Sequence, residues 1–227
     1  MEFIDVIRLK LRKYSIIKNA LSPLYTIYHH YIIYKLNRSY TKYGLDAFNV
    51  FCRTLNDINC SYWPEFGTLL GIYREGDFIK HDNDFDFGSF IQNRDTIISA
   101  LKNAGIELIH TYRCPDLEYI REDTFSYRGV HIDVFYFHSI GKKDYCHTFV
   151  PFEVNDGMQL HYKIKIFEFD AISLKEIDFK NLKISIPADT QSHLKVSYGE
   201  NFMTPDPNFK SITNTFIEGH YAVQEKQ

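Results

Sequence analysis

The most informative part of the chain runs from Gly67 to Gly88 and reads GTLLGIYREGDFIKHDNDFDFG. Near its end, carboxylates stand at every second position, at Asp82, Asp84 and Asp86. Side chains at positions i, i+2 and i+4 of a strand share one face, so the pattern predicts that all three converge. Phe85 and Phe87 then point to the other face and anchor the strand in the core. Adjacent carboxylates repel one another, and magnesium, held by one or two carboxylates plus substrate phosphates, relieves that repulsion.

A fourth carboxylate lies far downstream, at Asp133 in an apolar segment. A single Asp on a core strand is costly unless it is paired or bound to a metal. Upstream, Gly67 and Thr68 form a strand-to-helix turn whose backbone N–H groups and helix dipole suit a phosphate. Arg74 and Lys80 add positive charge near that turn. The combination indicates phosphoryl or nucleotidyl transfer.

Two plainer interpretations apply to the acidic stretch. A calcium-binding loop counted from Asp82 needs glycine at position six and glutamate at position twelve, but the glycine falls at seven and Asn93 stands at twelve. A solvated acidic turn is the second interpretation, and the alternating Phe85 and Phe87 count against it.

The basic side chains also have alternatives. Arg74 either binds phosphate, for which its planar guanidinium is suited, or forms a surface ion pair with Glu75 or Asp77. Lys80 and the adjacent His81 either contact substrate or are solvated loop residues.

The stretch from Gly67 to Gly88 resembles the signature of the LicD family of phosphotransferases, to which fukutin-related protein is distantly similar. That signature reads G-T-L-L-G, a following arginine, then I-P-W-D-x-D-x-D. This sequence keeps the first element, Arg74, Ile79 and the three aspartates, but has Lys80-His81 in place of Pro-Trp. The resemblance continues at His131-Ile132-Asp133 and at Leu194–Gly199, and covers roughly Ser61 to Pro207.

The resemblance implies transfer of a phospho-substituent, of the phosphocholine or polyol-phosphate type, from a CDP-activated donor to a sugar hydroxyl of a cell-surface glycan. It implies Mg²⁺ as the cofactor, with Mn²⁺ as the alternative, held by Asp84 and Asp86 with support from Asp82. Asp133 would complete the metal site or take the proton from the acceptor hydroxyl. The residues expected to bind substrate are Gly67, Thr68, Arg74, Lys80, Lys195 and Tyr198. Tyr198 is alternatively a packing residue before the helix-ending Gly199.

Helical and strand-like patterns alternate without regular βαβ order, which indicates an α+β fold. We expect a nucleotidyltransferase-like mixed sheet flanked by helices, with an N-terminal helical extension. Strands are predicted at 62–63, 84–87, 106–111, 117–121, 130–137, 161–169 and 182–186, and helices at the Gly67–Gly71 turn, around 97–104 and from 189 to 199. The expected division is 1–43, a basic, tyrosine-rich extension, and 44–227, the catalytic domain.

The N-terminal part of the chain is predicted to contain a helix around 3–14, an interruption at Pro23, a helix over 24–34, a connector over 37–44 and, where the catalytic domain begins, a helix over 45–56. Residues 1–43 carry a net charge of +6, against −3 for the whole chain. The extension therefore either packs on the body or contacts an anionic membrane surface.

The acidic body argues against nucleic acid as a partner. The four cysteines show no metal or disulfide spacing, and no apolar run reaches the length of a membrane span, so we expect a cytoplasmic protein, peripheral at the inner face of the membrane if the extension binds lipid. Two other functions stay open at this point. One is a nucleotidyltransferase that leaves an NMP on its acceptor, and the other is a non-catalytic, membrane-associated scaffold of glycan assembly.

Overall fold

The computed structural model describes residues 15–154, 159–206, 209 and 212–226. Its helices are α2 (Ser15–Asp57), α3 (Phe66–Glu75), α4 (Arg94–Asn103) and α5 (Thr190–Tyr198), with a short 3₁₀ turn at Ile91–Asn93. Its strands are β1 (Trp63–Pro64), β2 (Asp84–Phe90), β3 (Glu107–Arg113), β4 (Arg121–Tyr127), β5 (Val130–Ile140), β6 (Lys143–Val154), β7 (Leu160–Asp170), β8 (Leu174–Phe179), β9 (Leu182–Pro187) and β10 (Ala222–Lys226). The predicted helix around 3–14 lies outside the described residues.

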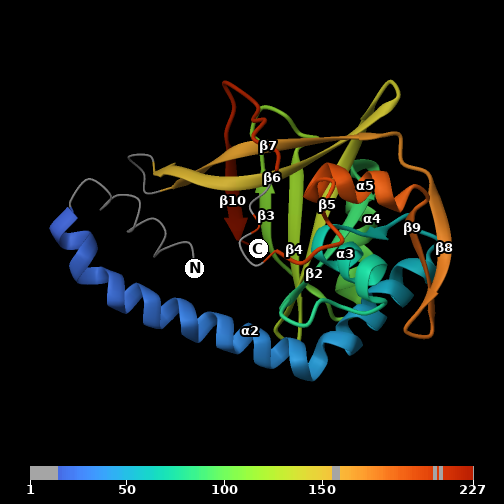
Figure 1. The fold of residues 1–227 in the computed structure, drawn as a ribbon, viewed down its shortest axis with the longest axis horizontal. Coiled ribbons are helices and arrows are strands. Elements are labelled where there is room, and N and C mark those ends of the chain that lie inside the picture. Colours follow the sequence, from blue (N-terminus) through green and yellow to red (C-terminus); the bar gives the residue numbers. More distant parts are fainter. Residues whose placement is uncertain (1–14, 155–158, 207–208, 210–211, 227) are drawn as a thin grey trace.

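The main sheet is mixed, which confirms the α+β class. Its strand order is β1-β2-β5-β4-β3-β10-β7-β6, and an additional β5–β6 pairing closes the strands from β5 to β6 into a ring (Figure 1). β2 runs parallel to β5, whereas the other described ladders of this sheet are antiparallel. The sequence patterns did not predict this closure. β8 and β9 form a separate hairpin.

The core behind β2 is aromatic, as the alternation of Asp and Phe predicted. Phe85 and Phe87 are 1% and 0% exposed. Phe87 stacks on Phe51 of α2 with ring centroids 4.1 Å apart, and Phe48 of the same helix contacts both strand residues. Burying each such ring stabilises the fold by about 1.5–3 kcal/mol. The opposite face of β2 is thereby left to the aspartates.

The N-terminal extension differs from its prediction. α2 is one helix from Ser15 to Asp57, so Pro23 lies inside it and the expected connector at 37–44 is helical. An interior proline removes one backbone hydrogen bond and disfavours the helix, yet α2 continues through Pro23. Residues 37–44 are helical because this segment packs on the body. The ring centroids of Tyr40 and Phe85 lie 4.9 Å apart, and Gly44 is buried.

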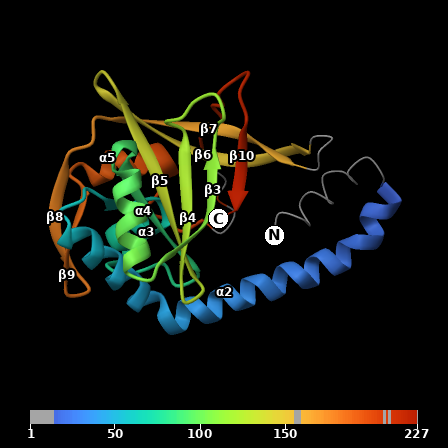
Figure 2. The ribbon, with the colours of Figure 1, turned by 180° about the vertical axis from the view of Figure 1, so that it is seen from behind.

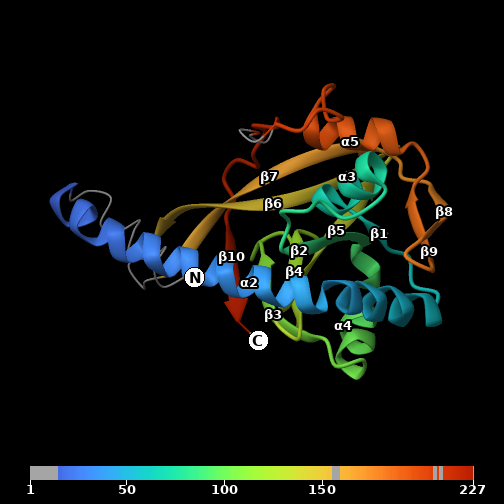
Figure 3. The same ribbon diagram turned by 60° about the horizontal axis from the view of Figure 1, so that its bottom comes forward.

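The first half of α2 projects from the body, and Figure 2 and Figure 3 show the same projection from other sides. None of the described helices combines the length and apolar character that a membrane crossing requires.

One predicted strand is wrong. Residues 117–120 form a turn, closed by the Ile120 N–H bonding to the carbonyl of Leu117, and β4 begins only at Arg121. Ile120 is buried as part of that turn, which explains why its hydrophobicity imitated a strand.

Candidate active site

Four carboxylates come together at the junction of β2 and β5. The parallel register places Asp86 directly beside Asp133, and Asp84 beside His131. On the other side of β5, Thr124 of β4 is paired with Asp133. The predicted core strand that carries Asp133 is present, and the structure pairs it directly with the acidic strand.

Asp82 reaches the same place from a turn rather than from the strand, since β2 begins at Asp84. A Cβ placed on Gly67 would lie 3.0 Å from Asp82 Oδ2 and 3.4 Å from Asp86 Oδ2. Glycine at this position therefore leaves open the space between the helix start and the two carboxylates.

The first turn of α3 is bonded to β2. The Gly67 N–H donates to Asp86 Oδ2 at 3.2 Å, and the Asp86 N–H donates to the Thr68 hydroxyl at 2.9 Å. The sequence predicted free amides here, but in this structure the Gly67 amide is taken by Asp86. Phe66, just before it, has φ of +39°, a conformation that a bulky residue holds only when its surroundings fix it.

All four carboxylates have a raised pKa. Burial, followed by the neighbouring Asp84 charge, raises the pKa of Asp133 to about 7. Burial and the charges of Asp84 and Asp133 raise the pKa of Asp86 well above its ordinary value. Burial also raises the pKa of Asp84, and burial followed by the Asp84 and Glu75 charges raises that of Asp82 to about 6. In addition, Asp133 Oδ1 is a buried oxygen without a hydrogen-bond partner among the described residues.

The predicted basic residues lie mostly at the edge of this cluster. Arg74 pairs with Glu75 at 2.7 Å, and its positive charge also lowers the pKa of Asp82 against the larger effect of burial. Lys80 is exposed in the turn before β2. Lys195 forms an ion pair with Glu200 at 2.8 Å.

Tyr198, at the end of α5, lies near enough to the carboxylates for their charges to affect its hydroxyl. Burial, followed by the charges of Asp86, Glu65 and Asp82, raises the pKa of its hydroxyl, and its ring lies 5.2 Å from that of Phe209. The last turn of α5 thus faces the start of α3 and the acidic cluster. Tyr198 therefore has a packing role at the end of α5, and its binding of substrate stays a prediction.

Three further residues near the cluster were missed in the sequence. Glu122 on β4 is 9% exposed, and burial followed by the Asp133 charge raises its pKa well above the ordinary value. Thr124 lies beside Asp133 in the β4–β5 register. Burial, followed by the charges of Asp82 and Asp84, raises the pKa of Tyr40 on α2. The strand pairing that brings Glu122 and Thr124 to Asp133 is non-local, so no spacing in the chain signals it.

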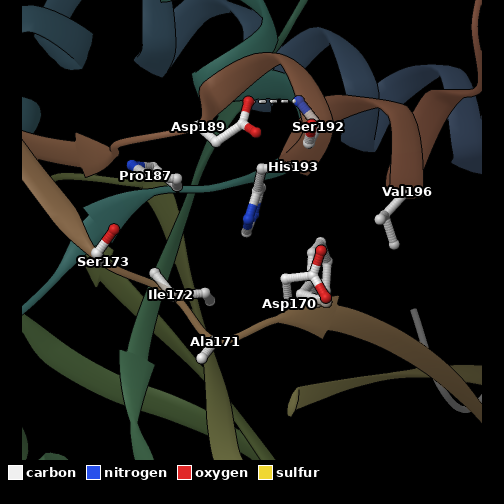
Figure 4. A pocket seen from close by; sticks show the side chains of 10 residues that line it. Asp170, Ala171, Ile172, Ser173, Pro187, Asp189, Ser192, His193 and Val196 are labelled. Atoms are coloured by element: carbon white, nitrogen blue, oxygen red, sulfur yellow. Dashed lines mark hydrogen bonds between the residues drawn. The ribbon is translucent and has the colours of Figure 1, made fainter. Parts of the chain in front are cut away.

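Two other features lie apart from the four carboxylates. A cavity of about 90 Å³ beside His193 is lined by residues of β7, the β9 end and α5 (Figure 4). Ligand atoms of Cys114, Asp116 and His220 lie within 4.8 Å of one another where β3 ends and β10 begins. A thiol is not a ligand that magnesium prefers, so this group is unrelated to the expected Mg²⁺.

Two aspartates on β2, beside α3, and a third on the parallel strand β5 form an acidic site of the kind found in enzymes that transfer phosphorus-containing groups. The chain belongs to the LicD/FKTN/FKRP family, whose nucleotidyltransferase-domain model matches residues 59–189. That range contains all four carboxylates and the Gly67–Gly88 stretch.

Among curated proteins, the chain is similar to ribitol-5-phosphate transferase FKTN of Homo sapiens, with 28% identity over 170 residues. The Macaca fascicularis and Mus musculus proteins of the same name are each 27% identical over 170 and 169 residues. These matches cover 74%, 74% and 73% of this chain but 34% of each relative, so the chain spans about a third of the proteins it matches.

Proposed function

We propose that this protein is a metal-dependent phosphotransferase that moves a phospho-substituent, such as ribitol phosphate or phosphocholine, from a CDP-activated donor to a sugar hydroxyl of a cell-surface glycan. The observation that carries the proposal is the pairing of Asp86 with Asp133 in parallel strands, with Asp84 and Asp82 beside them. Family membership and the similarity to ribitol-5-phosphate transferase FKTN support the same reaction class. We propose a nucleotidyltransferase-like arrangement of the sheet for the same reasons.

The chemistry of the residues present suits a divalent cation. The site offers oxygen ligands only, which suits Mg²⁺ or Mn²⁺, and the partnerless Asp133 Oδ1 is an oxygen available for coordination. We assign Asp84 and Asp86 as the principal ligands, with Asp82 and Asp133 as the further ones. When bound, the cation would neutralise charge on the donor diphosphate and on the departing CMP.

The chain's own groups supply the remaining functions. The bare Cα of Gly67 lets a phosphate approach the two carboxylates beside it, and Arg74 supplies positive charge at the same edge. The alternative role of Asp133 is to accept the acceptor hydroxyl proton instead of coordinating the cation, because a pKa raised to about 7 suits a general base near neutral pH, a function worth about 10²–10⁴-fold in rate. We assign Tyr198, Lys80 and Lys195 to contact with the donor or acceptor at the rim of the site.

The extension is proposed to rest on an anionic membrane surface, with the body on the cytoplasmic side. No acidic residue occurs between Asp5 and Asp46. The projecting part of α2 exposes Ile27, Tyr31 and Tyr34 by 66%, 54% and 61%, and aromatic and basic side chains of this kind favour the lipid headgroup region.

The test is a panel of CDP-ribitol, CDP-glycerol and CDP-choline. A donor that binds should raise the melting temperature only when Mg²⁺ is present. Transfer that releases CMP supports the proposal, whereas transfer of the nucleotidyl group with release of pyrophosphate identifies a nucleotidyltransferase. Absence of both Mg²⁺-dependent stabilisation and turnover with every donor would leave the scaffold function instead.

A further inference from the structure

Glu65, the residue immediately before α3, is a completely buried carboxylate with an exposed fraction of 0%. Its side chain accepts hydrogen bonds from Trp63 Nε1 at 2.7 Å and from the Phe66 N–H at 3.3 Å. His193 Nε2 lies 2.9 Å from both of its oxygens. Because both oxygens already accept N–H donors, the proton between the two side chains belongs to His193 Nε2, which donates to Glu65.

The same residue is bonded to the catalytic strand through its main chain. The Glu65 N–H donates to the Asp86 carbonyl at 2.9 Å, and the Glu65 carbonyl accepts from Leu69 in the first full turn of α3. Glu65 is the N-cap of that helix. Two residues later, the Gly67 N–H donates to the Asp86 carboxylate. A displacement of Glu65 would therefore move both the backbone and the carboxylate of Asp86.

The segment also needs an external constraint. Phe66 has a positive φ of +39°, which a phenylalanine does not adopt without surrounding contacts that fix it. The Glu65 cap on the Phe66 N–H is one such contact, and the packing of the Phe66 ring on Phe135 and Phe167 is another.

His193 supplies the constraint from a distant part of the chain. It lies on α5, 128 positions after Glu65, is 6% exposed, and stacks on Phe169 with ring centroids 4.2 Å apart. The charges of Asp86 and Glu65 both raise the pKa of Tyr198, on the same helix, in addition to the larger effect of burial. α5 is thus connected to the start of α3 at one end and faces the acidic cluster at the other.

We propose that Glu65 and His193 form a positioning pair, which holds the start of α3 so that the Asp86 carboxylate is set for metal binding. Neither side chain is assigned contact with metal or substrate. The role of the pair in catalysis rests on the function proposed above, but its effect on the geometry of Asp86 does not.

The experiment uses the full chain and Mn²⁺ alone, with bound and free metal measured by electron paramagnetic resonance. His193→Leu removes the donor, whereas His193→Gln keeps an N–H donor close to the position of Nε2. His161→Gln is the matched control, because His161 is also buried, stacked on an aromatic ring and paired with a glutamate, Glu153, yet lies on β7 away from the acidic cluster. Thermal melting and circular dichroism establish that each variant is folded at the temperature used.

We expect His193→Leu to weaken Mn²⁺ binding about tenfold, because a buried acceptor left without its donor relaxes the segment. His193→Gln should restore most of the affinity, and His161→Gln should leave it unchanged. Hydrogen exchange of a peptide spanning residues 64–72, which contains the Gly67 amide, should be faster in His193→Leu alone.

Parental Mn²⁺ affinity in folded His193→Leu would overturn the proposal, as would an equal loss in the His161→Gln control. If the parent protein itself binds no Mn²⁺, the metal part of the proposed function fails, and the pair is then judged by exchange alone. In that case, unchanged exchange at residues 64–72 in His193→Leu overturns it, and faster exchange there supports it.

Discussion

The stability of the metal-free protein should fall as pH rises, and Asp133 should account for a measurable share of that fall. Burial raises the pKa of Asp133 from 3.8 to about 7. The folded state therefore keeps this proton over a pH range in which the unfolded chain has lost it. A raised carboxyl pKa contributes stability that is complete below the unfolded value and is lost as pH rises through the folded value.

Between pH 5.5 and pH 8, a shift of this size corresponds to about 2 kcal/mol of lost stability. For a chain of this length that amounts to about 4–8 °C in melting temperature. Other groups titrate in the same window. His147, whose pKa burial lowers to about 3, works in the opposite direction because it must charge on unfolding at the lower pH. The quantity to measure is therefore the difference between two proteins rather than one absolute slope.

The assay is calorimetric melting of the parent and of Asp133→Asn at pH 5.5 and pH 8, in chelator and then in 10 mM Mg²⁺. Asp133→Asn cannot titrate, so its melting temperature should fall less with pH than that of the parent. Asp178→Asn, which changes an exposed carboxylate in the β8–β9 hairpin, is the control and should follow the parent. Mg²⁺ should raise the parent's melting temperature more at pH 8 than at pH 5.5, because protons compete for the same oxygens. Equal pH slopes for the parent and Asp133→Asn would refute the reasoning.

Further expectations concern catalysis, the membrane and the core. Asp84→Asn and Asp86→Asn should each abolish Mg²⁺-dependent transfer, measured as CMP release, while the circular dichroism spectrum stays that of the folded parent. Near-normal turnover in both variants at saturating Mg²⁺ would contradict the metal assignment. The double change Lys35→Glu and Arg38→Glu should reduce the fraction of protein that floats with anionic vesicles, because each basic residue near the surface contributes about 1 kcal/mol of binding free energy. Neutral vesicles are the control. Unchanged flotation would show that this part of α2 does not contact the membrane. Arg94→Met should lower the free energy of unfolding in urea by about 3–5 kcal/mol, because the fully buried Asp123 carboxylate loses its ion-pair partner at 2.8 Å. A loss below about 1 kcal/mol would show that the fold does not depend on this ion pair.

The part of the site that sequence reasoning predicted is the part encoded locally. The alternation of Asp84, Phe85, Asp86 and Phe87 has the period of a strand, and burial of the phenylalanines follows from that period. Residue spacing alone also places Gly67 at the start of a helix. These features depend on residues within about ten positions of one another.

The remaining features depend on contacts between distant segments. The pairing of Asp86 with Asp133 requires a parallel register that no spacing in the chain specifies. Glu65 looks like an ordinary residue before a helix until His193 is brought to it across 128 positions. The helical connector at 37–44 follows from the packing of Tyr40 on Phe85, which overrides the local preference for a break. The ring closes only because β10, at the far end of the chain, pairs with both β3 and β7.

The charge balance of the site gives the physical case for a cation. Two of the basic side chains expected to bind substrate, Arg74 and Lys195, are paired with Glu75 and Glu200. For the carboxylates themselves, burial outweighs every neighbouring positive charge, so the net effect is a raised pKa at each of the four. A cluster of this kind is stable in two ways, either by holding protons or by binding a multivalent cation, and the two compete for the same oxygens. At pH 7 Asp82, with a pKa of about 6, has largely lost its proton, and Asp133, with a pKa of about 7, is about to lose its own, so the proposed divalent cation competes with few protons at this pH.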